Sequence, residues 1–165
     1  MAAAYNRPLT DAEILANFEA GRPNSPPYLS PEPMNVTGVE SRPGQPEELV
    51  ITLDAGVDAD GDDIAVFIDA LPENGRLFQF QAAAGTDRGD EITAVGTQVT
   101  AAAQVRVVYV GSDDFFGDDA FVYSTRDANG ADSVFNRTVE IEISNTPSTP
   151  DVADVDVSVR RIASR

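Results

Sequence analysis

The chain has 165 residues, with 28 Asp and Glu against 11 Lys and Arg, and it contains no His and no Cys. A formal net charge of −17 argues against nucleic-acid binding, because phosphates require a basic surface. Without imidazole or thiol groups, zinc sites built from His and Cys and nucleophile systems that depend on them are excluded. Any metal would therefore be a hard, oxygen-liganded cation such as Ca²⁺.

The first predicted element is a short helix within residues 5–21. Thr10 is a suitable N-cap and Glu13 follows three positions later, which is the capping-box pattern. The apolar stripe of this helix consists of Ile14, Leu15 and Phe18. A helix this short needs a surface to pack on. We assign residues 1–22 to this N-terminal helical segment.

A proline-rich linker over residues 23–33 comes next, and from residue 34 the pattern changes to short strands between Gly, Asn and Asp turns. The predicted strands are ELVITLD (48–54), DIAVFID (63–69), GRLFQF (75–80), EITAV (91–95), QVRVVYV (104–110), DAFVYST (119–125) and VFNRTVEIEIS (134–144). About seven strands, roughly 8–12 residues apart, predict an all-β fold, an antiparallel β-sandwich over residues 34–145.

Residues 146–165 form a second proline-containing segment, predicted to be an extended C-terminal linker or a further strand. An Asn-x-Pro motif flanks the strands at both ends, as NSP at residues 24–26 and as NTP at residues 145–147. This is expected of a module in a tandem array whose linkers enter and leave at opposite poles. Arg160 and Arg161 form a basic cluster in this segment. They either dock on the acidic surface of a neighbouring copy or belong to a solvated tail.

The candidate metal ligands start in VDADGDD, residues 57–63. Three acids recur there at every second position, as the first ligands of an EF-hand loop do: Asp58, Asp60 and Asp62. An EF-hand is excluded because Gly61 falls too early and a strand follows instead of a helix. Other loops of a sandwich could still complete the site with Asp118, Asp119, Asp127 and Asn129. The alternative is an Asx-type turn without metal.

Aromatic and acidic side chains also bear on sugar binding and catalysis. The aromatic run is Phe115, Phe116, Phe121 and Tyr123, which either forms a sugar-stacking platform or fills the core. The many acids lie on turns and solvent faces, without the apolar pocket that raises one pKa in a glycosidase pair. We therefore expect that the chain is not an enzyme.

Three stretches occur in a characteristic order: VDADGDDIAVFI (57–68), LPENGRLF (71–78) and DDFFGDDAFVYSTRDANG (113–130). Their Asp-rich turn, Pro-x-x-Gly-x-Leu strand entry and aromatic-Gly-x-Asp strand resemble the cadherin-like, immunoglobulin-like repeats found in tandem in large bacterial surface and secreted proteins. The third stretch departs from that pattern, since Ala120 stands where Ser is common and FFG replaces Phe-Asn-Gly. The resemblance covers residues 24–145 and implies an immunoglobulin/cadherin-like β-sandwich.

The stretch YNRPLTDAEILANFEAG, residues 5–21, has a separate resemblance. It is similar to the C-terminal tail of a laminin-G-like, concanavalin-type jelly roll, in which a helix caps the barrel. The body of that fold is not in the sequence. The chain is therefore either a slice of a longer protein or a small protein that kept this tail for another use.

Charge and resemblance together predict an extracellular or cell-surface structural and adhesion module, a spacer of a repeat protein that Ca²⁺ could stiffen. Its expected partners are neighbouring domains or copies of itself, with surface proteins and glycans as further candidates. The first alternative is a structural subunit of a virion or a surface filament, with terminal segments that contact neighbouring copies. The second is a carbohydrate-binding module. Neither nucleic-acid binding nor membrane insertion is expected.

Overall fold

The computed structural model describes residues 7–21, 23–83, 86–100 and 104–146. These residues form one helix, α1 (Asp11–Ala20), and nine strands. The strands are β1 (Met34–Val39), β2 (Leu49–Thr52), β3 (Ile64–Ala70), β4 (Gly75–Ala83), β5 (Thr86–Ile92), β6 (Thr97–Gln98), β7 (Arg106–Gly111), β8 (Gly117–Asp127) and β9 (Arg137–Ser144).

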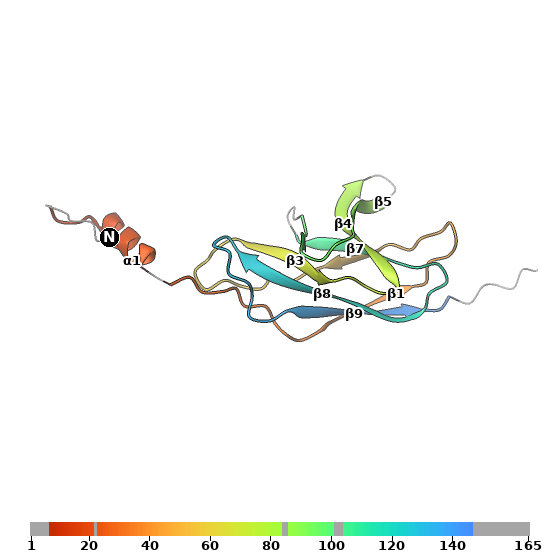
Figure 1. Ribbon diagram of the computed structural model, residues 1–165. Coiled ribbons are helices and arrows are strands. Elements are labelled where there is room, and N and C mark those ends of the chain that lie inside the picture. The colour runs from red at the N-terminus through yellow and green to blue at the C-terminus, as the bar shows by residue number, and fades with distance from the viewer. Residues whose placement is uncertain (1–6, 22, 84–85, 101–103, 147–165) are drawn as a thin grey trace, which may run out of the picture.

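The strands form two sheets that pack face to face (Figure 1). One sheet has the order β1-β9-β8-β3-β6 and the other the order β2-β7-β4-β5. Strand β1 runs parallel to β9, whereas the other paired strands are antiparallel. The predicted all-β sandwich is therefore confirmed. Among the described residues, no helix is long and apolar enough to cross a membrane.

The core lies between the sheets and is filled by alternate residues of the strands. On β9, the buried residues are Val139, Ile141 and Ile143, while Glu140 and Glu142 are exposed as predicted. On β8, Phe121 and Tyr123 are completely buried. These two aromatic side chains therefore fill the core and offer no platform for sugar stacking, although Phe116 is 57% exposed.

Strands β1 and β6 were not predicted from the sequence, and only the end of β5 was. The β5 sequence, TDRGDEI, has only one apolar residue, so no alternation marks it as a strand. It lies at an edge of its sheet, where β4 is its one neighbour among the described strands. An edge strand needs less apolar surface, because one side of it is solvated.

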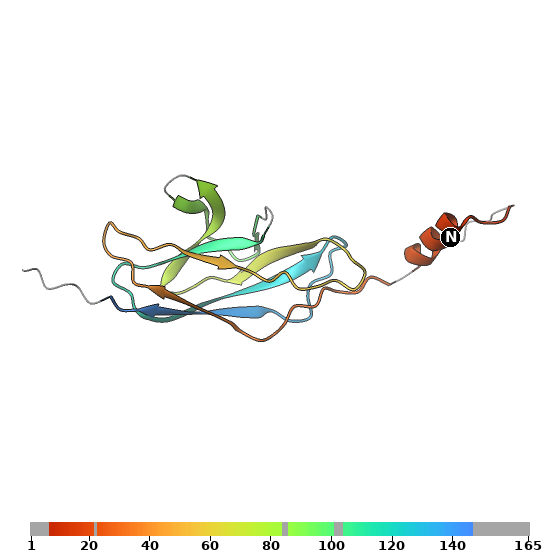
Figure 2. The same ribbon diagram turned by 180° about the vertical axis from the view of Figure 1, so that it is seen from behind.

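Helix α1 begins as predicted. The N–H of Thr10 donates to Glu13 Oε2 over 2.9 Å, and the N–H of Glu13 donates to Thr10 Oγ1 over 3.3 Å, which completes the capping box. Hydrogen bonds from Arg7 and from the Thr10 backbone lower the pKa of Glu13 to about 2. The apolar stripe remains uncovered, with Ile14 53% and Phe18 65% exposed. Figures 1 and 2 show α1 beyond one end of the sandwich.

Candidate functional site

The candidate site is a loop between β2 and β3 that carries Asp58, Asp60 and Asp62. Each of these residues offers a carboxylate oxygen, and the three atoms lie within 4.8 Å of one another. The loop turns about Asp58, whose Oδ1 accepts hydrogen bonds from the N–H of Asp60 (2.8 Å) and of Asp62 (3.2 Å). Gly61, with φ of 81°, adopts the left-handed conformation that favours glycine. The Asx-type turn and the cluster of possible ligands are thus the same structure.

The second oxygen of Asp58 is the least satisfied atom of this loop. Asp58 Oδ2 is buried and has no hydrogen-bond partner among the described residues. A buried acceptor without a donor is costly, and more so when it is charged. A hard cation would satisfy it, since carboxylate oxygens are the preferred ligands of Ca²⁺.

The turn after β8 brings two more of the predicted ligands to the same end of the sandwich. Asn129 Nδ2 donates a 2.5 Å hydrogen bond to Asp62 Oδ2. Asp127 is buried at the end of β8, and its Oδ1 accepts a hydrogen bond from the N–H of Ala131 over 2.8 Å. The Asp58 loop, this turn and the linker at residues 24–25 are called the entry pole below.

The linker is an integral part of the entry pole, a role that was not predicted from its sequence. The N–H of Ser25 donates to Asp60 Oδ2 over 2.7 Å. Asn24 donates through Nδ2 to Asp127 Oδ2 over 2.7 Å and accepts at Oδ1 from Asn129 over 3.1 Å. The Asn-Ser-Pro-Pro stretch was the available signal, although it indicated only a linker. The carboxylates of Asp60 and Asp127 therefore also fix the path of the linker.

Asp127 shows the electrostatic balance at the entry pole. Burial by itself raises the pKa of the Asp127 carboxyl, but the hydrogen bonds that it accepts outweigh burial and lower this pKa. The largest of them comes from Asn24, and backbone N–H groups of the following turn supply the rest. The carboxylate is thus held in its charged form by the linker and the turn.

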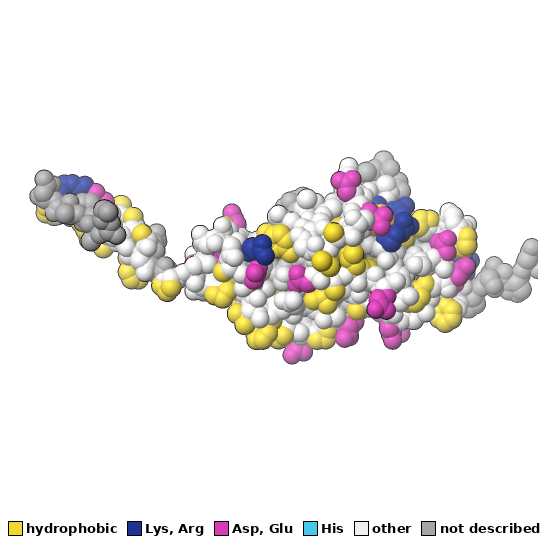
Figure 3. Space-filling view, viewed as in Figure 1, with side chains coloured by type: hydrophobic (Ala, Val, Ile, Leu, Met, Phe, Trp, Pro, Cys, Tyr) yellow, Lys and Arg dark blue, Asp and Glu magenta, His cyan; other side chains and the backbone are white. Residues whose placement is uncertain are grey.

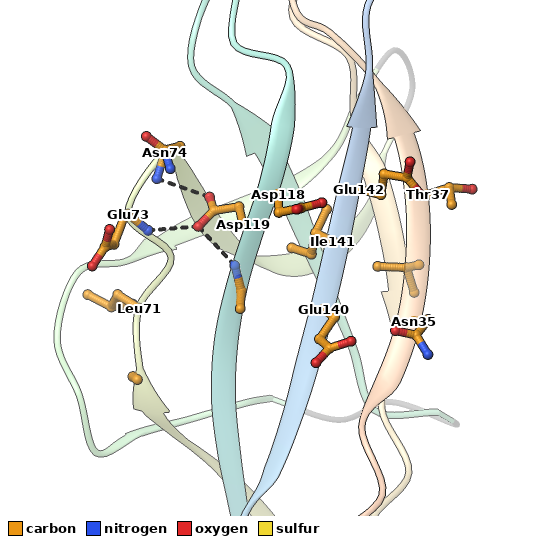
Figure 4. Close-up of a pocket in the computed structure, with 13 residues that line it drawn as sticks. Asn35, Thr37, Leu71, Glu73, Asn74, Asp118, Asp119, Glu140, Ile141 and Glu142 are labelled. Atoms are coloured by element: carbon orange, nitrogen blue, oxygen red, sulfur yellow. Dashed lines mark hydrogen bonds between the residues drawn. The ribbon is translucent and has the colours of Figure 1, made fainter.

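Asp118 and Asp119 lie at the opposite end of β8, which is 11 residues long. At about 3.3 Å per residue, Asp119 is roughly 25 Å from Asp127 along the strand. Its buried carboxylate accepts a hydrogen bond from Tyr109 Oη (2.9 Å). It also accepts from the N–H groups of Glu73 and Asn74 (3.0 Å each), as Figure 4 shows. The structure therefore does not bring these two acids to the Asp58 loop.

Comparisons with known proteins do not assign this chain to a family. No family model matches the sequence, and no curated protein matches it. The chain is similar to a variant of the endo-fucoidan hydrolase MfFcnA4 from glycoside hydrolase family 107, with 14% identity and a TM-score of 0.44, over 74% of this chain and 14% of that one. MfFcnA4 itself matches with 15% identity and a TM-score of 0.41, over 79% of this chain and 15% of the hydrolase. The chain thus spans a small part of the length of these hydrolases.

A third similar structure is the ASH/PapD-like domain of human CEP192, PapD-like domain 7. It shares 10% identity with a TM-score of 0.36, and the match covers 70% of this chain and 84% of that domain. The neighbours thus include an immunoglobulin-like sandwich. At these identities the likeness concerns the fold alone, and no match confirms the cadherin-like repeat.

The hydrolases among these structures correct one expectation. We expected that the chain is not an enzyme, and this is contradicted because two of the three structures are glycoside hydrolases. The expectation rested on the solvated positions of the acids. The positions of these acids concern this sandwich alone. They do not decide whether such a domain is part of a larger enzyme. The likeness assigns no reaction to this chain.

Proposed function

We propose that this chain is a structural linking module whose entry pole is stiffened by a divalent cation, with Ca²⁺ as the first candidate. One observation carries the proposal. The loop that clusters three carboxylates, one oxygen of which is buried and has no partner in the described part of the chain, also holds the incoming linker through the Ser25–Asp60 hydrogen bond.

The chemistry of the entry pole favours Ca²⁺ over Mg²⁺. Like charges this close repel one another, and the net charge of −17 adds to the repulsion. Ca²⁺ accepts six to eight oxygen ligands in flexible geometry, whereas Mg²⁺ demands a near-ideal octahedron. The entry pole offers carboxylate and amide oxygens on three separate segments, an irregular set that suits the larger ion.

The path of the chain supports a linking role. The linker enters at the entry pole, and β9 leads the chain out at the opposite end (Figures 1 and 2). The sandwich therefore separates the two linkers by about the length of β8, roughly 35 Å for 11 residues. A cation at the entry pole would fix residues 24 and 25 against the sandwich and so limit bending at this junction. Millimolar extracellular Ca²⁺ suits such a site, which is why we propose an extracellular or cell-surface setting.

Nuclear magnetic resonance of the ¹⁵N-labelled full chain tests this function. We expect Ca²⁺ to shift the amide signals of Ser25, Asp60 and Asp62 with saturation in the millimolar range or below, and Mg²⁺ to do so more weakly. The D60N/D62N variant should lose the response, while D90N, which neutralises an exposed acid on β5, should keep it. Equal responses of wild type and D60N/D62N would contradict the proposal.

A second candidate function, a subunit of a virion or surface filament, is favoured by exposed apolar surface. Besides the stripe on α1, Tyr28 of the linker and Phe135 of the sandwich are exposed, and their rings meet edge to face with centroids 6.4 Å apart. Figure 3 shows apolar side chains on the surfaces of both α1 and the sandwich. Light scattering coupled to size-exclusion chromatography decides between the two. A concentration-dependent oligomer favours the subunit, and a monomer at all concentrations favours the linking module.

A further inference from the structure

A groove of about 830 Å³ lies on strands β1, β9 and β8 of the five-stranded sheet, far from the entry pole (Figure 4). Its floor is the outer face of these three strands, and one wall is the segment that follows β3. The polar residues that line it include Asn35, Thr37, Glu73, Asp118, Glu140 and Glu142.

The charge of this groove is uncompensated. Four of its carboxylates are exposed, and none forms an ion pair within the described part of the chain: Glu73, Asp118, Glu140 and Glu142. Glu142 is also directly opposite Asp118 in the β8–β9 register. Like charges opposite one another destabilise a sheet. The arrangement therefore favours a cationic occupant.

The chain leaves the sandwich beside this groove. Two hydrogen bonds hold its exit, one from the N–H of Thr146 to Glu40 Oε1 (3.0 Å) and one from Arg42 Nη2 to the carbonyl oxygen of Thr146 (2.8 Å). Thr146 follows Glu142 by four positions. Whatever follows residue 146 therefore starts close to the acidic groove.

We propose that the basic segment at residues 158–165 of the same molecule docks in this groove. Its sequence, SVRRIASR, has three Arg and no acid in a chain of net charge −17. The guanidinium groups of Arg160 and Arg161 would pair with Glu140, Glu142 and Asp118, because planar guanidinium groups suit carboxylates.

The length of the connection makes docking within one molecule the expected arrangement. Arg160 follows Thr146 by fourteen positions, a connection that spans up to roughly 45–50 Å when extended. This reach exceeds the short return from the exit to Glu142. A tethered segment has an effective concentration of the order of millimolar, well above that of a second copy in ordinary solution. The docked segment would direct the leaving linker back along β9, independently of any cation at the entry pole.

Disulfide trapping in the full chain tests the proposal. The chain has no Cys, so the variant T37C/I162C has only the two introduced thiols and keeps every proposed ion pair, since Thr37 lines the groove opposite Glu142. The matched control is T52C/I162C, because Thr52 is exposed on β2 of the other sheet. Docking through exposed ion pairs predicts that the groove pair forms an intramolecular disulfide about tenfold faster than the control pair.

Two further measurements make the test specific. Adding D118N and E140Q to the groove pair, or raising the salt to about 1 M, should reduce its rate to that of the control, since exposed ion pairs are screened. In the cysteine-free chain, R160Q/R161Q should shift the amide signals of Glu140 and Glu142. Equal rates for the two cysteine pairs, disulfide-linked dimers as the only product, or unshifted signals would overturn the proposal.

Discussion

Tyr109 on β7 and Asp119 on β8 join the two sheets through the core by a 2.9 Å hydrogen bond from Tyr109 Oη to Asp119 Oδ2. The carboxylate also accepts from the N–H groups of Glu73 and Asn74, so it fixes the segment that crosses from β3 to β4. Asp119 was a candidate metal ligand in the sequence. In the structure its oxygens accept hydrogen bonds that stabilise the fold.

Replacing Asp119 should therefore destabilise the sandwich strongly. Asp119→Ala leaves a buried Tyr hydroxyl and two backbone donors without their acceptor, which we expect to lower the free energy of unfolding by about 3 kcal/mol. Asp90→Asn, at an exposed acid of β5, should change it by less than about 0.5 kcal/mol. Urea unfolding followed by circular dichroism measures both. Equal effects of the two variants would show that the buried carboxylate has no special structural role.

The contact between Tyr109 and Asp119 also predicts a loss of stability at alkaline pH. Burial first, and then the hydrogen bond to Asp119, raises the pKa of Tyr109, and burial also raises the pKa of Tyr123. The stabilising effect is complete below the unfolded tyrosine pKa of about 10 and is lost as the pH rises above it, because only the unfolded chain then releases protons.

Urea unfolding between pH 8.5 and 11 measures this effect. Each tyrosine can contribute a slope of up to about 1.4 kcal/mol per pH unit above pH 10. Tyr109→Phe should be less stable at pH 8.5 and should show a shallower decline above pH 10. The same decline in wild type and Tyr109→Phe would exclude Tyr109 as its source.

Gly75 makes room for the Tyr109 ring. A Cβ atom at Gly75 would lie 2.3 Å from Tyr109 Cε2, a distance that forces the ring or the strand to move. We expect Gly75→Ala to cost about 3 kcal/mol of unfolding free energy by overpacking. Gly96→Ala is the control, since φ there is 77° and no heavy atom lies within 4 Å of the added carbon. It should cost only the 1–2 kcal/mol, roughly, of a left-handed residue.

The elements that could be predicted from the sequence are those with a local residue pattern. Alternation identified β9 because its apolar residues share one face, and the capping box placed the start of α1 next to Thr10. Strand β5 was mostly missed, since it is held by β4 and carries little apolar surface of its own. A strand that depends on its neighbour leaves a weak local signal.

The candidate site was predicted where its residues lie in polar turns, which include Asp127 and Asn129, and it was missed in the linker. Asp58, Asp60 and Asp62 form one turn, so their spacing already indicated a cluster. Asn24, which lies more than a hundred positions before Asp127 and Asn129, has no local pattern that would reveal these contacts. Asp119 looks like any acid of a polar turn, and only its contact with Tyr109 from the other sheet shows that it is structural.

A calcium titration of the melting temperature tests the central claim most directly. For a dissociation constant of 0.1–1 mM, about 10 mM Ca²⁺ would stabilise the folded chain by roughly 1.4–2.7 kcal/mol, which raises the melting temperature by about 5–10 °C. The D60N/D62N variant should show no such rise, whereas D90N should behave like wild type. An unchanged melting temperature in wild type, or an equal rise in D60N/D62N, would contradict cation binding at the entry pole.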